Sequence, residues 1–184
     1  MNKFAYLVAA SALAVSAFGQ GQINLNNRGL ALVNDAAGKP LTGTSFVAQV
    51  LYGASASSLT KSFAPSPFRA STTTYPGTWN PAATGGPGAI ATLDGFAPGS
   101  TVTLQVAVWD SAVFSSWAAA QGKANTGLSS TFTYAIPADP LAIPGGMEGL
   151  QTFKLSAGGT VVPEPTTIAL GALGAAALLW RRRK

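Results

Sequence analysis

Carboxylates are the side chains with the clearest catalytic potential in this 184-residue sequence, because the chain contains no histidine and no cysteine. Without histidine the chain lacks the commonest general base and metal ligand, and every Ser-His or Cys-His nucleophile is excluded. Two carboxyl groups held about 5 to 10 Å apart can still hydrolyse a glycosidic bond. The acids available between residues 20 and 162 are Asp35, Asp94, Asp110, Asp139 and Glu148.

Each of these acids also has a structural explanation. Asp35 and Asp94 stand beside small residues in expected turns, and Asp110 ends an expected strand. Asp139 lies among prolines, and Glu148 belongs to the turn-like stretch PGGMEG. We therefore predict no catalytic residues and no cofactor. A carbohydrate-active enzyme that uses two of Asp94, Asp110, Asp139 and Glu148 is the alternative.

A metal site is also not expected. The sequence contains no Asp-rich loop of the kind that dedicated calcium sites use. Without cysteine, thiolate metal sites and disulfides are excluded. Calcium held by backbone carbonyls together with Asp110 or Asp94 stays open as an alternative.

Aromatic residues supply a candidate binding site. The stretch TTTYPGTWNP, residues 72–81, places Tyr75 and Trp79 among hydroxyl and amide groups. Flat aromatic faces beside hydrogen-bonding groups suit sugar rings, so Tyr75 and Trp79 are candidate carbohydrate contacts. The competing interpretation is that Trp79 closes the end of the core. Trp109 and Trp117 are expected to pack in the core or against a helix.

Short strands must position these residues. In STVTLQVAVWD, residues 100–110, apolar and polar residues alternate strictly, which predicts a half-buried strand. TSFVAQVLYG, residues 44–53, is a second predicted strand. Weaker strand patterns cover residues 22–26, 30–34, 89–93, 130–136 and 150–155, and only residues 113–122 have a helical pattern.

These short elements, separated by turn residues, predict an all-β domain. We expect an antiparallel β-sandwich, of jelly-roll or Ig-like type, with one short helix. Residues 60–88 contain five prolines and four glycines and are too long for a simple hairpin loop. A loop of this length is expected to be either functional or mobile.

The N-terminal segment has the layout of a secretory signal peptide. Lys3 is followed by an apolar stretch over residues 4–18, with small residues at Ala17 and Gly19. We predict cleavage between Gly19 and Gln20 after export through the Sec translocon. An uncleaved anchor is the alternative, but the apolar stretch is shorter than the roughly 20 residues of a spanning helix.

The C-terminal segment combines a proline-flanked acid, an apolar stretch and a cationic end. Residues 166–180 carry no charge and would form a helix about 22 Å long. That length spans a bilayer only marginally, so this predicted transmembrane helix is a poor permanent anchor. The cations that follow should keep the C-terminus in the cytoplasm; they are Arg181, Arg182, Arg183 and Lys184.

The net charge of +5 is caused by the two ends of the chain. Five of the eleven cations and one of the six acids lie in the terminal segments, so residues 20–162 carry six cations and five acids. Nucleic-acid binding requires clustered Lys and Arg, and these six cations are scattered. The composition therefore gives no support to a nucleic-acid partner.

Pro163, Glu164 and Pro165, the apolar stretch and the terminal arginines together resemble the PEP-CTERM sorting signal of Gram-negative bacteria that make exopolysaccharide. The resemblance implies that a membrane-embedded exosortase recognises the three PEP residues and cleaves nearby. It also implies that residues 168–180 are a temporary anchor and that residues 181–184 are the cytoplasmic stop signal. The protein would then reach the cell surface or the extracellular matrix.

Three segments follow from this reading: a signal peptide over residues 1–19, an exported domain over residues 20–157, and a linker with the sorting signal over residues 158–184. The stretches FVAQVLYG and APGSTVTLQVAVWDS also resemble, more loosely, the exported domains that precede such signals. That likeness implies a β-sandwich but no activity. We expect a non-enzymatic envelope or matrix protein that contacts exopolysaccharide or other surface proteins. A stably tail-anchored surface protein is a further alternative.

Overall fold

The computed structural model describes residues 20–81 and 89–157 of the chain. The predicted signal peptide, the transmembrane helix at 166–180 and the sorting signal lie outside these residues. So do Gly19, the tripeptide Pro163, Glu164 and Pro165, and the terminal cations Arg181, Arg182, Arg183 and Lys184. Among the helices of the described ranges, none combines the length and apolar character that crossing a membrane requires.

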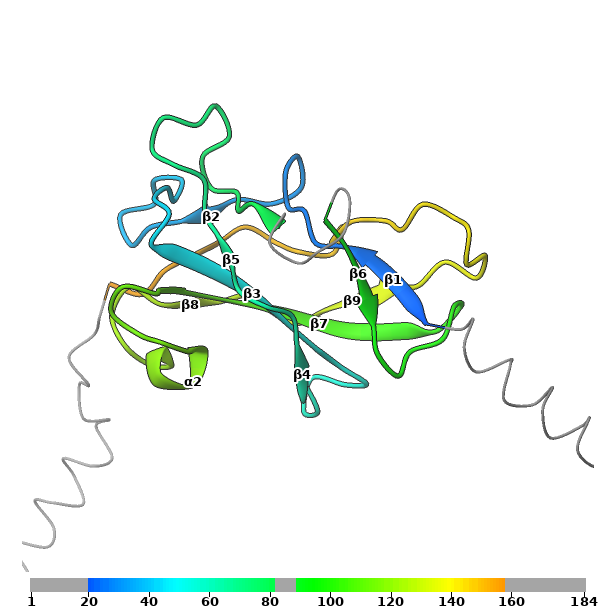
Figure 1. Cartoon of the computed structure of the whole chain (residues 1–184). Helices are drawn as coiled ribbons and strands as arrows, with labels where there is room; N and C mark the ends of the chain where they lie inside the picture. Colours follow the sequence, from blue (N-terminus) through cyan, green and yellow to red (C-terminus); the bar gives the residue numbers. More distant parts are fainter. Residues whose placement is uncertain (1–19, 82–88, 158–184) are drawn as a thin grey trace, which may run out of the picture.

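A six-stranded antiparallel sheet forms the base of the domain (Figure 1). Its two long central strands pair in register from Phe46 opposite Asp110 to Gly53 opposite Thr103. Two short strands extend the sheet on the side of β3, and two more extend it on the side of β7. The six strands are β3 (Phe46–Gly53), β4 (Lys61–Ser62), β5 (Ser66–Pro67), β7 (Thr101–Asp110), β8 (Gly127–Leu128) and β9 (Phe132–Ala135).

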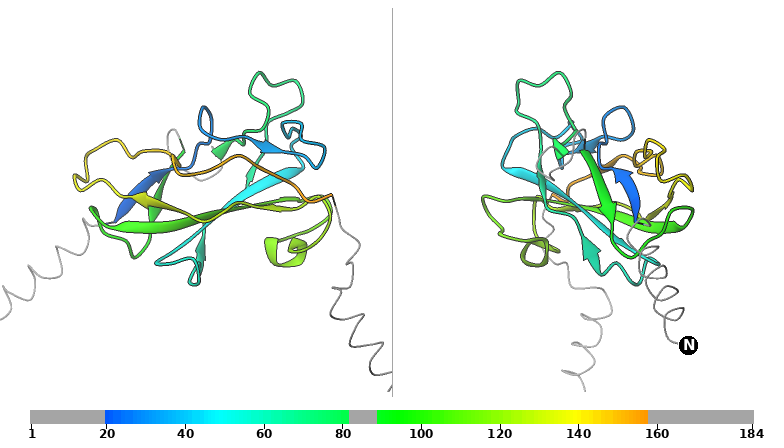
Figure 2. Two further views of the ribbon diagram at one scale, coloured as in Figure 1. Left: turned by 180° about the vertical axis from the view of Figure 1, so that it is seen from behind. Right: turned by 45° about the vertical axis from the view of Figure 1, so that its right-hand side comes forward.

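Two small sheets cover one face of this base, and the helix α2 (Trp117–Ala120) lies on the other (Figures 1 and 2). β1 (Gly21–Asn24) pairs antiparallel with β6 (Ile90–Leu93). β2 (Val33–Asn34) pairs parallel with β10 (Phe153–Lys154). The all-β prediction is confirmed. The parallel pair departs from the expected all-antiparallel pattern, because β2 and β10 are distant in the chain and no hairpin sets their relative direction.

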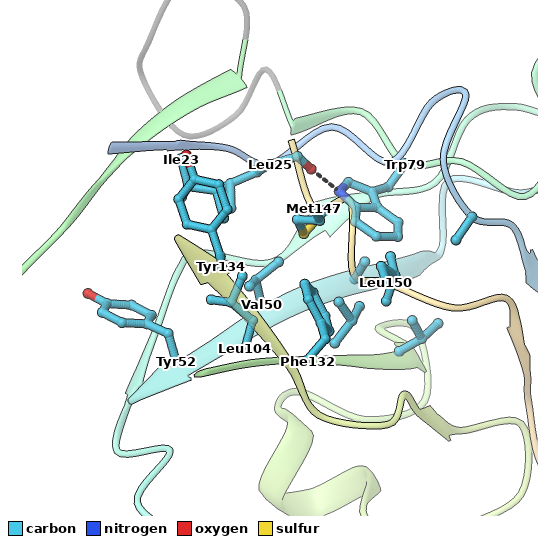
Figure 3. Close-up of a cluster of buried hydrophobic side chains, with 14 of the residues drawn as sticks. Ile23, Leu25, Val50, Tyr52, Trp79, Leu104, Phe132, Tyr134, Met147 and Leu150 are labelled. Atoms are coloured by element: carbon cyan, nitrogen blue, oxygen red, sulfur yellow. Dashed lines mark hydrogen bonds between the residues drawn. The ribbon is translucent and has the colours of Figure 1, made fainter. Parts of the chain in front are cut away.

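The main core lies between the base and the two small sheets (Figure 3). The alternating apolar residues of β7 are all fully buried there, as the sequence pattern predicts; they are Val102, Leu104, Val106 and Val108. A smaller cluster on the opposite face joins Trp109 to Ala120 of α2, and the Trp109 and Trp117 rings are 6.2 Å apart. Both tryptophans therefore take part in the packing of α2, as expected.

Tyr52, near the end of β3, is buried under aromatic neighbours. Its ring stacks on Phe63 at 4.8 Å and meets Phe96 edge-on at 6.1 Å. Burial raises the pKa of Tyr52 above its ordinary value of 10.0, and the negative charge of Asp94 raises it further. A backbone hydrogen bond from Asp94 acts in the opposite direction. The folded domain therefore favours the neutral form of this phenol more strongly than the unfolded chain does.

The raised pKa of Tyr52 predicts a loss of stability in alkali. Above a pH of about 10, the unfolded chain releases the Tyr52 proton while the folded chain retains it, so the free energy of unfolding falls as pH rises. Urea titrations between about pH 8 and pH 11 should show a smaller fall in Tyr52→Phe than in the wild type. Parallel curves for the two proteins would contradict the assignment.

Candidate functional site

Residues 69–78 form a loop that projects from the layer opposite α2, drawn teal-green in Figure 1. Its base is closed by a bridge between Phe68 and Trp79. The Arg69 amide donates to the Thr78 carbonyl at 3.2 Å, and the Asn80 amide donates to the Pro67 carbonyl at 2.8 Å. This part of the long predicted loop is therefore an ordered, hairpin-like projection.

Trp79 belongs to the core and offers no face to a ligand. The side chain is 1% exposed, and its indole nitrogen donates to the Leu25 carbonyl at 2.9 Å (Figure 3). Phe68 meets the ring edge-on at a centroid distance of 5.9 Å. Of the two interpretations open from the sequence, the structure therefore places Trp79 as the residue that closes the core. Trp79 is therefore not a carbohydrate contact, because burial of a large indole is more favourable than its exposure on a loop.

Asn27 connects this projection to the neighbouring loop that follows β1. The side chain is fully buried, and its amide nitrogen donates to the carbonyls of Ala31 at 2.9 Å and Gly77 at 3.1 Å. Its amide oxygen accepts from the Trp79 backbone N–H at 3.3 Å. One buried amide therefore satisfies three backbone groups from two loops and fixes their relative position.

Tyr75, the second predicted carbohydrate contact, remains at the surface with 40% of its side chain exposed. The guanidinium carbon of Arg28 lies 3.6 Å from the centre of its ring. Tyr75 itself is held at both backbone groups, because its N–H donates to the Thr73 hydroxyl at 3.1 Å and its carbonyl accepts from the Thr78 hydroxyl at 2.8 Å. The backbone N–H of Arg28 donates to the Asn26 side-chain oxygen at 2.8 Å. The stacked pair is therefore positioned by the backbone on both sides.

An open groove of about 320 Å³ adjoins the same loop. Its lining is rich in hydroxyl, amide and guanidinium groups; the residues are Thr44, Pro67, Phe68, Arg69, Ala70, Thr72, Thr73 and Asn80. Thr73 links this groove to Tyr75 through the hydrogen bond described above. The Arg69 Nε donates to the Thr78 hydroxyl at 3.2 Å, which orients its guanidinium. Such a set of donors and acceptors matches the hydroxyl groups of a sugar chain.

Three of the five acids of residues 20–162 have a local structural role. Carboxylate oxygens of Asp35, Asp110 and Asp139 each accept a backbone N–H within a local turn. Asp139 and Glu148 line separate grooves, and none of the grooves described here contains two acids. In residues 20–81 and 89–157, no three acids gather in a way that could hold a metal ion.

Tyr134 lines the same groove as Glu148, which has a volume of about 240 Å³. The pKa of Tyr134 is raised above its ordinary value, mainly by burial. A backbone hydrogen bond from Gly145 lowers this pKa, and the negative charge of Glu148 makes a smaller contribution that raises it. The Tyr134 hydroxyl donates to the Gln22 carbonyl at 3.0 Å. The phenol is thus used to join β9 to β1.

Sequence reasoning alone did not identify Arg28 or Asn27. Both belong to the polar stretch NLNNRG, residues 24–29, which carries no recognisable motif. Their partners Tyr75, Gly77 and Trp79 are distant in the chain, and only the fold brings them together. The one sequence signal for this surface was the aromatic stretch TTTYPGTWNP, residues 72–81, which contains Tyr75.

Comparison with known proteins identifies the C-terminal segment. Residues 161–184 match the family model of the PEP-CTERM protein-sorting motif. No curated protein and no solved structure is significantly similar to the chain. The match confirms the resemblance predicted from the PEP tripeptide and the terminal arginines. A signal of this kind marks an exported protein that exosortase processes and that is destined for the cell surface or the extracellular space.

Replacing Asn27 should loosen both loops. We expect Asn27→Ala to lower the free energy of unfolding by at least about 2 kcal/mol, because it leaves buried backbone groups without partners. Asn27→Asp keeps the shape of the side chain but places a carboxylate against two carbonyl oxygens. This variant should therefore be no more stable than Asn27→Ala. Urea denaturation measures both variants.

The matched control is Asn80→Ala, which changes an exposed asparagine and should stay within about 0.5 kcal/mol of the wild type. Equal stability of the Asn27→Ala and Asn80→Ala variants would contradict the role assigned to Asn27.

Proposed function

We propose that the chain is a non-enzymatic protein of the cell envelope or extracellular matrix whose exported domain associates with exopolysaccharide. The observation that carries this proposal is the PEP-CTERM sorting motif at residues 161–184. A protein delivered by that route works at the polysaccharide-rich surface. Other surface proteins are the second class of partner.

Processing occurs at both ends in this proposal. The Sec route delivers the chain, and cleavage between Gly19 and Gln20 removes the signal peptide. The helix at residues 166–180 holds the protein in the inner membrane for a limited time, with residues 181–184 in the cytoplasm. Exosortase then acts near the PEP tripeptide and releases the exported β-sandwich, residues 20–157.

The polysaccharide contact is proposed at the loop of residues 69–78. Tyr75 is the exposed aromatic residue there, and the adjoining groove supplies the Thr72, Thr73 and Asn80 side chains. Exposed aromatic surface can pack on the C–H face of a sugar ring while hydroxyl and amide groups bond its edges. Hydrogen bonds to the backbone fix Tyr75 in advance, which reduces the entropy lost on binding.

Intact-mass measurement of the protein recovered from producing cells tests the sorting step. We expect the mature species to lack residues 1–19 and the residues that follow the PEP region. Glu164→Gln with Pro163→Ala and Pro165→Ala should instead keep the C-terminal segment, because the recognition tripeptide is lost. A wild-type protein that keeps residues 166–184 would contradict the proposal and favour a stable tail anchor.

Retention on exopolysaccharide tests the role of the domain. The processed protein, purified from the producing cells, should be retained by the producer's own exopolysaccharide and leave the length of the polymer unchanged. Absence of retention would overturn the polysaccharide contact. Shortening of the polymer that is abolished by a change at Asp94, Asp110, Asp139 or Glu148 to the matching amide would favour the enzyme alternative.

A further inference from the structure

We propose that the surface formed by Arg28, Tyr75 and Arg69 selects an anionic polysaccharide whose sugar rings carry carboxylates, that is, a polymer containing uronic acid residues. This inference rests on the proposed association with exopolysaccharide and specifies the chemistry of the ligand. It is carried by the geometry of the two arginines and by the charge of the segments around them.

Arg28 presents a guanidinium that is oriented and has no acidic partner. Its carbon lies 3.6 Å from the centre of the Tyr75 ring, so one flat face of the guanidinium is covered. No Asp or Glu of the described ranges forms an ion pair with it. The N–H groups at the edge of a stacked guanidinium remain able to form two parallel hydrogen bonds to a carboxylate.

Tyr75 supplies the second half of the recognition surface. Its side chain is 40% exposed beside the stacked Arg28. The exposed part of the ring can pack on the apolar C–H groups of a sugar. A uronic acid offers a C–H face and a carboxylate on the same ring. A neutral sugar would use only Tyr75, and a small inorganic anion would use only Arg28.

Arg69 extends the same chemistry into the groove of about 320 Å³. Its Nε donates to the Thr78 hydroxyl, which in turn donates to the Tyr75 carbonyl, so Arg69 and Tyr75 are held through one residue. None of the residues that line this groove is acidic. Arg69 is therefore placed to meet a second carboxylate of a repeating polymer.

The local charge differs from that of the whole domain. Two segments meet at this surface, residues 24–46 and 66–80, as the hydrogen bonds of Gly77 to Val33 and Leu41 and of Gly43 to Arg69 show. Together they contain three cations, Arg28, Lys39 and Arg69, and one acid, Asp35. The rest of residues 20–162 carries three cations and four acids. Positive potential is thus concentrated at the site that also holds the exposed tyrosine.

Binding of the processed protein to two matched polymers tests the inference. One polymer is a polyuronate, and the other is the same polymer after reduction of its carboxyl groups to neutral sugars. We expect the wild type to bind the polyuronate at least about tenfold more tightly, since charge-assisted hydrogen bonds account for such differences. Arg28→Gln and Tyr75→Ala should each lose about tenfold in affinity for the polyuronate. Arg28→Lys should recover only part of it, because lysine lacks the planar fork.

Lys123→Gln is the matched control, because it removes the same charge from an exposed residue after α2 and should bind the polyuronate within about twofold of the wild type. Equal binding of both polymers, or equal losses in Arg28→Gln and Lys123→Gln, would overturn the inference and leave polysaccharide association intact. An acidic polypeptide that binds as tightly as the polyuronate would also overturn it, in favour of a protein partner. Failure of the wild type to bind either polymer or the producer's exopolysaccharide would overturn the proposed function itself.

Discussion

The buried side chain of Asn27 is the interaction on which the candidate surface depends. It bonds to backbone groups of Ala31, Gly77 and Trp79, and so joins the loop after β1 to the base of the loop of residues 69–78. Burial of this polar group is tolerated because both its donors and its acceptor are used. Arg28 directly follows Asn27, and Tyr75 precedes Gly77 by two residues. Their stacking is therefore a consequence of a rigid connection beneath them.

The architecture supports this arrangement in two ways. The long pairing of β3 with β7 supplies a stable base whose upper face is covered by the small sheets. Trp79 then anchors the projecting loop in the core, through its packing on Phe68 and its hydrogen bond to Leu25. With no disulfide available, such side-chain anchors hold the loops of the exported domain in place. In Figure 1 the two ends of the described chain, coloured blue and orange, lie at opposite ends of the sheet.

The sequence predicts the regular elements well and the surface only in part. Strict alternation over residues 100–110 identifies β7 and its buried face, since a strand with one face in the core leaves that pattern. The pairs formed by β4, β5 and β8 are two residues long and are too short to leave a pattern. The Arg28–Tyr75 contact depends on tertiary structure alone. The sorting motif is the opposite case, because its signal is linear and complete in the sequence.

The proposed binding of an acidic polysaccharide at the surface formed by Arg28, Tyr75 and Arg69 requires direct contact with two loops. Hydrogen exchange of the processed protein, with and without a polyuronate, locates this contact without altering any residue. With the polyuronate bound, we expect slower exchange in residues 26–32 and 69–80, and unchanged exchange in residues 111–123 around α2. Slower exchange only around α2, or no change anywhere under conditions of binding, would contradict this expectation.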